Sequence, residues 1–408
     1  MPTTANRNIE LARRTLAARP SEVRKVFRAA QRPGMISFAN GAPYLGALDF
    51  EQLAESSQRI LRESGSIALQ YGAGQGTLEL RQHICRLMAL EGIRAAPEDV
   101  IVTCGSQQAL DLASKVLINP GDVVFAEAPS YAGGMAVFTG LEAEIVHVPT
   151  DENGLIPEEL EARIAKVRAA GKTAKALYTI PNFHNPGGMN LSPERRALVG
   201  QLCTENGLLI FEDNPYGLLG FEGQTMRAIQ PDFQDITLYF GSFSKMFAPG
   251  LRIGWVVAPE RLREHLVNAN ETTVLNPSVL SQMILTEYLD TPGWKSTLEE
   301  YRALYAAKCD VLVDALSQNM PAGTTWTRPE GGFYLWVTVP EGIDTDALVY
   351  ECIERGVVYV PGTAFFTDGS GHDKLRFSFC LPTHEEIRKG AAIVGEVFSQ
   401  ALTGTGAR

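Results

Sequence analysis

Apolar runs of strand length alternate with amphipathic segments of helix length through the middle of the chain, and this alternation constrains the fold more than any other feature. The runs expected to form buried strands are 99–104, 122–129, 143–149, 174–181, 207–213, 236–240 and 252–258. Helical patterns lie between them, such as 106–118 and 192–206. The second pattern begins with Ser192 as N-cap and Pro193 at the first helical position, and it ends before Gly207. Strands that alternate with helices predict a mostly parallel seven-stranded sheet covered on both faces.

The alternation stops near residue 290, which predicts a second, smaller unit. A helical pattern over 294–318 leads into the apolar runs "GGFYLWVTV" and "KLRFSFC", which are typical of strands in an α+β domain. A chain of 408 residues is long enough for this arrangement. We therefore predict an N-terminal segment that acts as a substrate lid, a large α/β domain and a small α+β domain, at 1–50, 51–290 and 291–408.

The charge and the cysteines exclude several classes of partner. The formal net charge of -11 argues against broad binding to nucleic acid or anionic membranes, and no stretch approaches the ~18 apolar residues of a membrane span. None of the six cysteines forms C-x-x-C or lies near a histidine at metal-ligand spacing, so we expect reduced thiols and no metal site. The N-terminal "MPTTANRNIELARRT" has no apolar core of a secretory signal. The sequence thus predicts a cytoplasmic protein.

Polar side chains follow all but one of the predicted strands. Because ligands in open α/β sheets bind beyond the carboxyl ends of the strands, these side chains are expected to meet in one site. They include Ser106 and Gln107, Tyr131, Asn185, Asp213 and Tyr216, and Ser242, Ser244 and Lys245.

Lys245 lies in "YFGSFSKMFAPGLRIGW", among aromatic and apolar residues that follow a predicted buried strand. Removal from water favours the neutral amine of a lysine, which can act as a nucleophile. Pyridoxal phosphate needs such a lysine for a Schiff base and an acidic partner for its ring nitrogen, a role that suits Asp213. The alternatives are a snorkelling lysine and an aspartate that forms a cap or turn before Pro215.

The remaining strand-end residues can be assigned to the other parts of this cofactor. Asn185 and Tyr216 are expected to bond its phenolic oxygen, and Tyr131 to stack on its ring. The phosphate would be held by a helix N-terminus, hydroxyls and a guanidinium, supplied by Ser106, Gln107, Ser242, Ser244 and Arg252. The alternatives are core aromatics for the tyrosines, a turn at Asn185 and a structural ion pair for Arg252. His184 is expected to be structural.

Nine stretches, in order, carry a resemblance to a known family. They are "RPGMISFANGAP", "LQYGAGQGTLELR", "TCGSQQALDL", "EAPSYAG", "IPNFHNPGG", "FEDNPY", "GSFSKMFAPGLRIGW", "RPEGGFYLW" and "LRFSF", and they extend over about residues 20–380. In these stretches the chain resembles the fold-type I pyridoxal-phosphate aminotransferases of class I/II. Within that class it resembles the branch that includes 2-aminoadipate and kynurenine aminotransferases and the aminotransferase-like domain of MocR-type regulators.

The resemblance implies roles for individual residues. Lys245 matches the Schiff-base lysine and Asp213 the partner of the ring nitrogen. Arg376 matches the arginine that binds the substrate α-carboxylate, a bidentate task suited to guanidinium. Tyr71 matches a tyrosine that reaches the phosphate and substrate of the neighbouring subunit, which implies a homodimer with active sites at the interface. Arg24 falls where an arginine can meet a distal carboxylate.

One stretch departs from the branch. Asn40 and Gly41 stand where two glycines are common, Ala42 stands where a leucine is common, and "YLGALDF" replaces a proline-rich continuation. Because Gly41 and its neighbours are expected to lie near the substrate side chain, the amino donor does not follow from the resemblance.

Three functions are compatible with these residues. The first is an aminotransferase that moves the α-amino group of an L-amino acid to a 2-oxo acid, with 2-oxoglutarate the expected acceptor, by a ping-pong mechanism. The second is another reaction of the same cofactor, such as that of a β-lyase, decarboxylase or synthase, since the fold does not choose between them. The third is a sensor like the MocR effector domain. We expect no such sensor, because fewer residues precede the first matching stretch than a winged helix needs.

Overall fold

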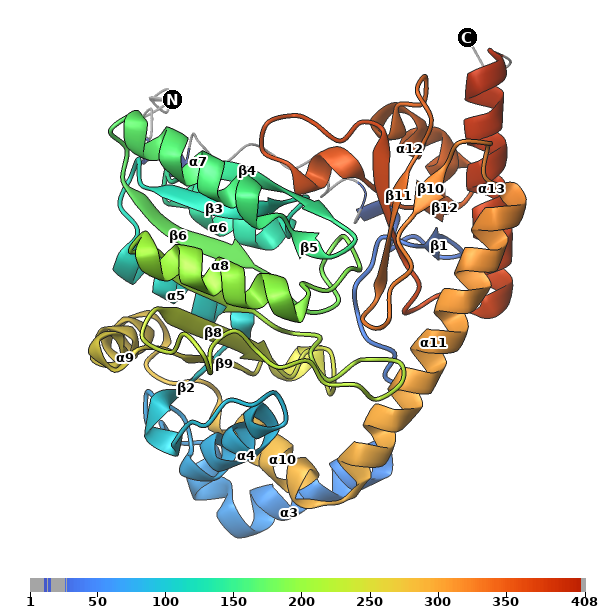
Figure 1. The fold of residues 1–408 in the computed structure, drawn as a ribbon. Helices are drawn as coiled ribbons and strands as arrows, with labels where there is room; N and C mark the ends of the chain where they lie inside the picture. The colour runs from blue at the N-terminus through green and yellow to red at the C-terminus, as the bar shows by residue number, and fades with distance from the viewer. Residues whose placement is uncertain (1–10, 13, 16–25, 27, 405–408) are drawn as a thin grey trace, which may run out of the picture.

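The computed structural model describes residues 11–12, 14–15, 26 and 28–404 (Figure 1). Its largest sheet has eight strands in the order β2-β9-β8-β7-β6-β3-β4-β5. Their bounds are β2 Val100–Thr103, β3 Val123–Ala128, β4 Glu144–Asp151, β5 Gly154–Leu155, β6 Ala174–Thr179, β7 Leu209–Asp213, β8 Thr237–Ser242 and β9 Gly254–Val257. All seven predicted runs form strands of this sheet, and the two-residue β5 is an addition that the sequence pattern did not indicate.

The strand directions bring most carboxyl ends to one edge. Five strands of the sheet pair in parallel with one another, namely β3, β4, β6, β7 and β8. Strand β9 is antiparallel to both β8 and β2. β2 therefore runs in the same direction as β8. The segments that follow β2, β3, β6, β7 and β8 consequently start at the same edge of the sheet, as predicted.

Helices cover both faces of this sheet (Figure 1). They are α5 Ser106–Leu117, α6 Ala132–Gly140, α7 Pro157–Ala169, α8 Pro193–Glu205 and α9 Glu260–Val274. Apolar residues of α5, α6 and α9 form one buried cluster with Val124 and Ala126, and those of α7 and α8 form another with Val123 and Phe125. Alternate residues of β3 thus point into opposite cores, which explains its continuous apolar pattern. The predicted cap of α8 is present, since Ser192 accepts a hydrogen bond from the Arg195 amide.

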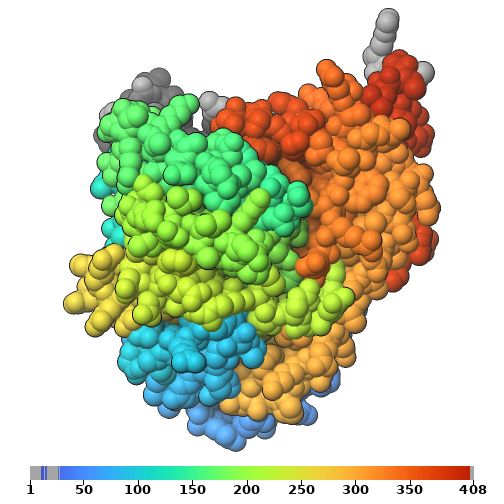
Figure 2. Space-filling view, in the orientation of Figure 1, coloured from blue at the N-terminus to red at the C-terminus, as the bar shows by residue number. Residues whose placement is uncertain are grey.

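The C-terminal part contains a second, antiparallel sheet of four strands in the order β10-β11-β14-β13. Its elements are α11 Gly293–Asn319, β10 Thr325–Trp326, β11 Tyr334–Thr338, α12 Thr345–Glu354, β12 Val357–Val358, β13 Val360–Pro361, η3 Gly362–Phe365, β14 Lys374–Ser378 and α13 His384–Thr403. The predicted long helix and the two predicted strands are therefore confirmed. In the space-filling view this part lies against the large-sheet part along a broad contact (Figure 2).

The remaining elements precede β2, lie between β8 and β9, or lie between α9 and α11. They are β1 Ile36–Ser37, α3 Phe50–Ala68, α4 Leu78–Ala89, η1 Pro97–Asp99, η2 Pro249–Leu251 and α10 Val279–Asp290. α10 packs against α3 and α4, and β1 pairs in parallel with β12. The extended N-terminal piece therefore crosses to the C-terminal part. In the part of the chain that the structure describes, no helix is long and apolar enough to cross a membrane.

The predicted domain boundaries coincide with ends of elements. The boundary at 50 falls at the start of α3, and the one at 290 falls between α10 and α11. The division into domains itself stays a prediction. Residues 1–10, 13, 16–25 and 27 of the predicted N-terminal segment lie outside the described residues.

Candidate active site

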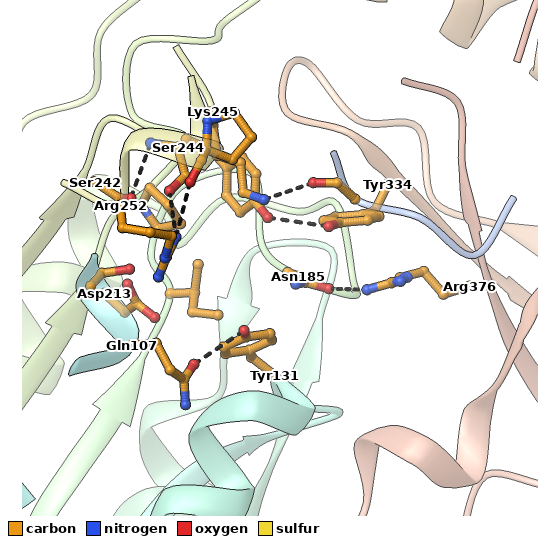
Figure 3. Close-up of a pocket in the computed structure, with 16 residues that line it drawn as sticks. Gln107, Tyr131, Asn185, Asp213, Ser242, Ser244, Lys245, Arg252, Tyr334 and Arg376 are labelled. Carbon is orange, nitrogen blue, oxygen red and sulfur yellow. Dashed lines mark hydrogen bonds between the residues drawn. The ribbon is translucent and has the colours of Figure 1, made fainter. Parts of the chain in front are cut away.

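A cavity of about 280 Å³ lies at the carboxyl edge of the large sheet, between this sheet and the C-terminal one (Figure 3). Its wall contains the nine residues that the strand-end pattern predicted, and also Arg252, Gly41 and Arg376. The sixteen lining residues are Gly41, Ser106, Gln107, Tyr131, Ile180, Asn185, Asp213, Pro215, Tyr216, Ser242, Ser244, Lys245, Pro249, Arg252, Tyr334 and Arg376. The cavity is therefore lined by segments that are far apart in the sequence.

Lys245 enters the cavity from the loop that follows β8. Its Nζ donates a hydrogen bond to the Gly41 carbonyl oxygen over 2.7 Å and lies 5.8 Å from the centre of the Phe333 ring. The side chain is half-buried. An amine in this position is held by one backbone acceptor and faces the cavity, so it can reach a group bound there.

Asp213, the last residue of β7, presents a free carboxylate oxygen. One oxygen, Oδ2, accepts a hydrogen bond from the Tyr178 hydroxyl over 2.7 Å, whereas Oδ1 is buried with no hydrogen-bond partner. Burial raises the pKa of Asp213 to about 6, and the Tyr178 hydroxyl and the Lys245 ammonium oppose this rise. A buried acceptor without a partner is costly, so Oδ1 is suited to a cationic N–H of a ligand.

The start of α5 and the side chain of Arg252 form a polar concavity that depends on two glycines. A Cβ on Gly105, which has φ +86°, would lie 2.3 Å from Arg252 Nη2. A Cβ on Gly254 would lie 2.4 Å from the amide nitrogen of Ser106. Because both positions are glycine, the first amides of α5 and the guanidinium remain accessible, as an anion site at a helix N-terminus requires.

Serine hydroxyls lie beside this concavity. Arg252 Nη1 donates to Ser244 Oγ over 3.4 Å, and the Ser244 amide donates to Ser242 Oγ over 3.1 Å. On the opposite side, Tyr131 donates to Gln107 Oε1 over 3.2 Å, and Gln107 Nε2 donates to the Gly133 carbonyl oxygen over 2.9 Å. The Gln107 side chain therefore holds the Tyr131 ring at the cavity wall (Figure 3).

Arg376 on β14 reaches the cavity from the C-terminal sheet. Its Nη1 donates to Asn185 Oδ1 over 2.8 Å and its Nη2 donates to the Ala39 carbonyl oxygen over 2.7 Å. A guanidinium has five N–H donors, and Arg376 Nε is buried without a partner. Donors thus remain for a carboxylate in the cavity, in line with the predicted role.

Asn185 is placed by a buried turn that His184 supports. The Gly187 amide donates to His184 Nδ1 over 3.0 Å, so the imidazole proton is on Nε2, which lies 3.1 Å from Glu127 Oε2. Glu127 accepts hydrogen bonds from the Thr179 hydroxyl and the Ile180 amide. His184 therefore has the structural role that the sequence predicted.

Tyr334 is a cavity residue that the sequence analysis missed. It is the first residue of β11, it is 3% exposed, and its hydroxyl accepts a hydrogen bond from the Tyr216 hydroxyl over 3.3 Å. It lies in the stretch "RPEGGFYLW", which contributed to the resemblance without any assigned role. The signal that could have found it is the glycine pair before the strand, because this pair allows close approach of another segment.

Two predicted site residues are not at this cavity. Tyr71 is 77% exposed and contacts the side chain of Gln70 through its amide. Because the resemblance places Tyr71 in the site of a neighbouring subunit, its role stays a prediction. Arg24 lies outside the described residues.

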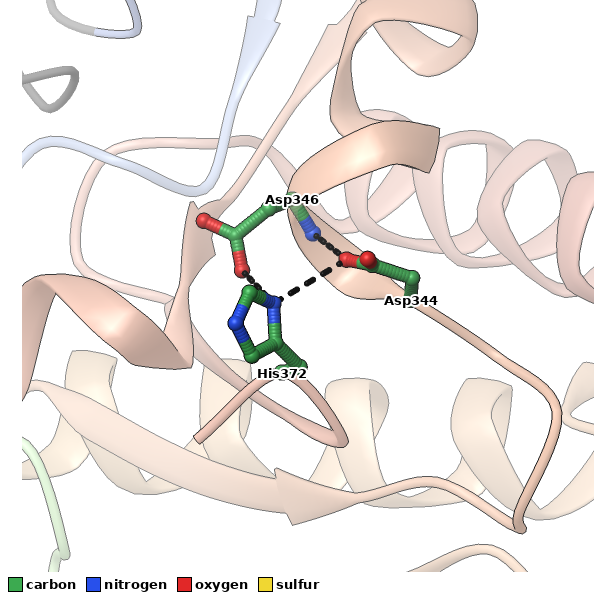
Figure 4. Close-up of side chains that lie close together, drawn as sticks. All are labelled: Asp344, Asp346 and His372. Atoms are coloured by element: carbon green, nitrogen blue, oxygen red, sulfur yellow. Dashed lines mark hydrogen bonds and ion pairs between the residues drawn. The ribbon is translucent and has the colours of Figure 1, made fainter. Parts of the chain in front are cut away.

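A separate group of titratable side chains lies at the start of α12 (Figure 4). Asp344 caps this helix by accepting from the Asp346 and Ala347 amides. His372 Nδ1 lies 3.4 Å from Asp344 and 3.2 Å from Asp346 Oδ2, and the Thr363 hydroxyl contacts Asp346. These contacts join the loop before β14 to the helix, and none of these residues lines the cavity.

The cavity fits a phosphorylated pyridine in its chemistry. It offers an acceptor without a partner at Asp213, an amine at Lys245, and a helix N-terminus with hydroxyls and a guanidinium at the far end. Among the described residues that line it, the cations are Lys245, Arg252 and Arg376. The residues present therefore match the charges of the ring nitrogen, the carbonyl carbon and the phosphate of pyridoxal phosphate.

Comparisons with known proteins agree with this chemistry. Residues 33–394 match the family described as "Aminotransferase class I and II". The chain is 34% identical over 391 residues to aromatic-amino-acid aminotransferase 1 of Thermococcus litoralis, covering 95% of this chain and 94% of that protein. It is 35% identical over 387 residues to 2-aminoadipate transaminase of Thermus thermophilus, covering 94% of each.

The fold also matches a solved structure over nearly its full length. LysN, the α-aminoadipate aminotransferase of Thermus thermophilus, superimposes with a TM-score of 0.88 at 32% sequence identity, covering 96% of this chain and 98% of that one. That structure contains N-(5'-phosphopyridoxyl)-L-leucine.

Proposed function

Because this chain belongs to the class I and II aminotransferases, and is therefore a pyridoxal-phosphate-dependent transferase, we propose that it moves the α-amino group of an L-amino acid to 2-oxoglutarate by a ping-pong mechanism. The observation that carries this proposal is the position of Lys245 and Asp213 on one cavity wall with Arg376 on the other. A ping-pong reaction needs one site that accepts both a donor and an acceptor. Both substrates have an α-carboxylate, for which Arg376 supplies the partner.

The chain's own residues account for the parts of the reaction that a protein must supply. Bound pyridoxal phosphate supplies an electron sink that makes the Cα proton of an amino acid removable. Lys245 Nζ takes this proton and returns it as general base and acid. Asp213 would hold the protonated ring nitrogen through Oδ1, which is buried without a partner, and the concavity at α5 would hold the phosphate.

The same cofactor can support a β-lyase, decarboxylase or synthase, so the reaction itself has to be measured. The experiment is a screen of amino donors with purified protein, 2-oxoglutarate and pyruvate as acceptors, and detection of released pyruvate and carbon dioxide. We expect formation of glutamate from 2-oxoglutarate. Release of pyruvate or carbon dioxide without amino transfer would replace this function by one of the alternatives.

We further propose that the enzyme is a homodimer in which Tyr71 completes the partner's site. Support comes from a run of large side chains that this chain leaves open to solvent, namely Ile67, Leu69 and Tyr71, which are 64%, 73% and 77% exposed. Contiguous apolar exposure of this kind indicates an interface. Sedimentation should give about twice the mass of the 44.4 kDa chain, and a monomer with full activity would exclude this proposal.

A cytoplasmic location is also a proposal. It rests on the six cysteines, all of which are free in the structure. Fractionation of cells that produce the protein tests it.

A further inference from the structure

Tyr334 contacts two other groups of the cavity with different parts of its side chain. Its hydroxyl lies 3.3 Å from the Tyr216 hydroxyl, and the two rings meet edge to face with their centres 5.9 Å apart. The guanidinium carbon of Arg376 lies 4.2 Å from the centre of the Tyr334 ring. One buried side chain therefore bridges the residue expected at the cofactor's phenolic oxygen and the residue expected at the substrate carboxylate (Figure 3).

The hydroxyl of Tyr334 occupies a space that Gly41 leaves for it. A Cβ on Gly41 would lie 1.9 Å from Tyr334 Oη, so any larger residue there would displace this hydroxyl. The carbonyl oxygen of Gly41 accepts the hydrogen bond from Lys245 Nζ. The position of the phenol is therefore fixed against the same backbone that holds the reactive amine.

We propose that Tyr334 is a positioning residue that directs the Tyr216 proton toward the cofactor through its hydroxyl and fixes the Arg376 plane through its ring. The proposal rests on the proposed function. A phenol has a single proton. When Tyr216 donates its proton to the cofactor's phenolic oxygen, the hydrogen bond between the two tyrosines persists only if Tyr334 is the donor. The hydrogen bond from Tyr334 then strengthens the hydrogen bond from Tyr216 to the cofactor.

The ring acts on Arg376 independently of the hydroxyl. The guanidinium carbon lies 4.2 Å from the centre of the Tyr334 ring and 5.0 Å from the centre of the Phe365 ring, so two aromatic rings contact it. Bonds to Asn185 and to the Ala39 carbonyl oxygen fix its edge. The rings thus set the plane in which the remaining N–H groups meet a carboxylate.

The surroundings of the tyrosine pair contain several other charged or titratable groups. Burial raises the pKa of Tyr216 well above its ordinary value. Tyr334 and Tyr131 raise this pKa further, whereas Arg376 lowers it. Asp213, Lys245 and Arg252 line the same cavity. Because substitution of Tyr334 by phenylalanine changes none of these charges at neutral pH, its effect reports the hydrogen bond.

The first test is the pH midpoint of the visible absorption band of the holoenzyme. Removal of a donor from the phenolic oxygen would make this oxygen more basic, so the bound cofactor would change its absorption at a higher pH. We expect Tyr216→Phe to raise the midpoint by about 1–2 pH units and Tyr334→Phe by about 0.2–0.6. In the double variant Tyr334→Phe should add nothing to the shift from Tyr216→Phe.

The matched control is Tyr359→Phe. Tyr359 is fully buried and donates to the Thr345 carbonyl oxygen over 2.7 Å, and it does not line the cavity. Loss of this hydroxyl should leave the midpoint unchanged, so a general loss of stability is separated from an effect on Tyr216.

The second test separates the ring from the hydroxyl. The ligand is the unreactive monocarboxylate 3-phenylpropanoate, and its binding is measured by the change that it causes in the visible band. Its affinity should be about 2- to 30-fold weaker in Tyr334→Leu and nearly unchanged in Tyr334→Phe, which keeps the ring. The phenylalanine variant and the double variant decide the hydroxyl arm even if the leucine variant does not fold.

The outcomes distinguish this inference from the proposed function. A wild-type protein that shows no visible band with added pyridoxal phosphate overturns the proposed function. A normal wild-type band with no shift in Tyr334→Phe, or with additive shifts in the double variant, overturns the positioning role instead.

Discussion

The cavity has two walls that differ in how they are built. The strand-end wall consists of Ser106, Asp213, Ser242, Ser244, Lys245 and Arg252, which lie at or after the ends of β2, β7 and β8 or just before β9. The composite wall consists of Gly41, Asn185, Tyr334 and Arg376, which come from the segment after β1, the turn after β6 and the C-terminal sheet. The first wall follows from the direction of parallel strands, whereas the second depends on contacts between distant segments.

This difference corresponds to a difference in the predicted ligand of each wall, the cofactor for the first and the substrate for the second. The strand-end wall presents charges that match a cofactor common to many reactions. The composite wall contains Arg376, for which the predicted partner is the α-carboxylate that donor and acceptor share. Variants of the strand-end wall should therefore weaken cofactor binding and turnover, whereas variants of the composite wall should weaken the use of substrates.

Arg376→Ala should have the largest effect among the composite-wall variants. Its loss leaves the substrate carboxylate and Asn185 without their charged partner, at a cost of about 2–5 kcal/mol, or roughly 30- to several-thousand-fold in kcat/KM. Steady-state kinetics with several donors and both acceptors should show an equal loss for all of them. A loss confined to one donor would assign Arg376 to the side chain of the substrate.

Asp213→Ala should weaken cofactor binding and slow transamination at least ~100-fold, about 2.7 kcal/mol, with all substrates alike. Without the carboxylate the ring nitrogen loses its proton at neutral pH. Tyr178→Phe is the matched control, since it removes the bond to Oδ2 and keeps the charge. Near-normal turnover of the alanine variant would refute the assignment of the strand-end wall.

Arg24→Ala tests whether the predicted N-terminal lid belongs to the composite wall. If Arg24 contacts a distal carboxylate, its loss should lower kcat/KM for 2-oxoglutarate relative to pyruvate by the equivalent of roughly 1.5–3 kcal/mol. The kcat/KM for apolar donors should be unchanged. The measurement is kcat/KM for both acceptors. An equal loss for both would leave Arg24 a structural charge.

Glu91→Gln tests the support beneath the strand-end wall. Glu91 is buried and accepts hydrogen bonds from Asn214, next to Asp213, and from Tyr239. Burial raises the pKa of Glu91 to about 7 from 4.5, so the stability that it contributes is present below pH 4.5 and is lost as the pH rises through 7.

Between pH 5 and 7.5 the free energy of unfolding should therefore fall by about 2 kcal/mol less in the glutamine variant than in the wild type. Urea unfolding of both proteins at the two pH values measures this difference. If the pH dependence of the free energy of unfolding is unchanged in the variant, another group controls this dependence. Glu212 is an example, since burial raises its pKa to about 7 as well.

The two walls also differ in how far the sequence predicts them. All seven large-sheet strands and the residues after them were predicted, because apolar period and strand direction are local signals. Tyr334 was missed because its role depends on space left by Gly41, nearly 300 residues earlier in the chain. Tyr71 was assigned through the resemblance alone, since in one chain its side chain is exposed.

The position of Lys245 in the cavity predicts that its amine bonds covalently with pyridoxal phosphate. The most direct measurement is reduction of the holoenzyme with borohydride, followed by digestion and mass spectrometry of the lysine-containing peptides. We expect a phosphopyridoxyl group on Lys245 and none on this peptide in Lys245→Ala. A label on a different lysine, or a protein that takes up no cofactor, would contradict it.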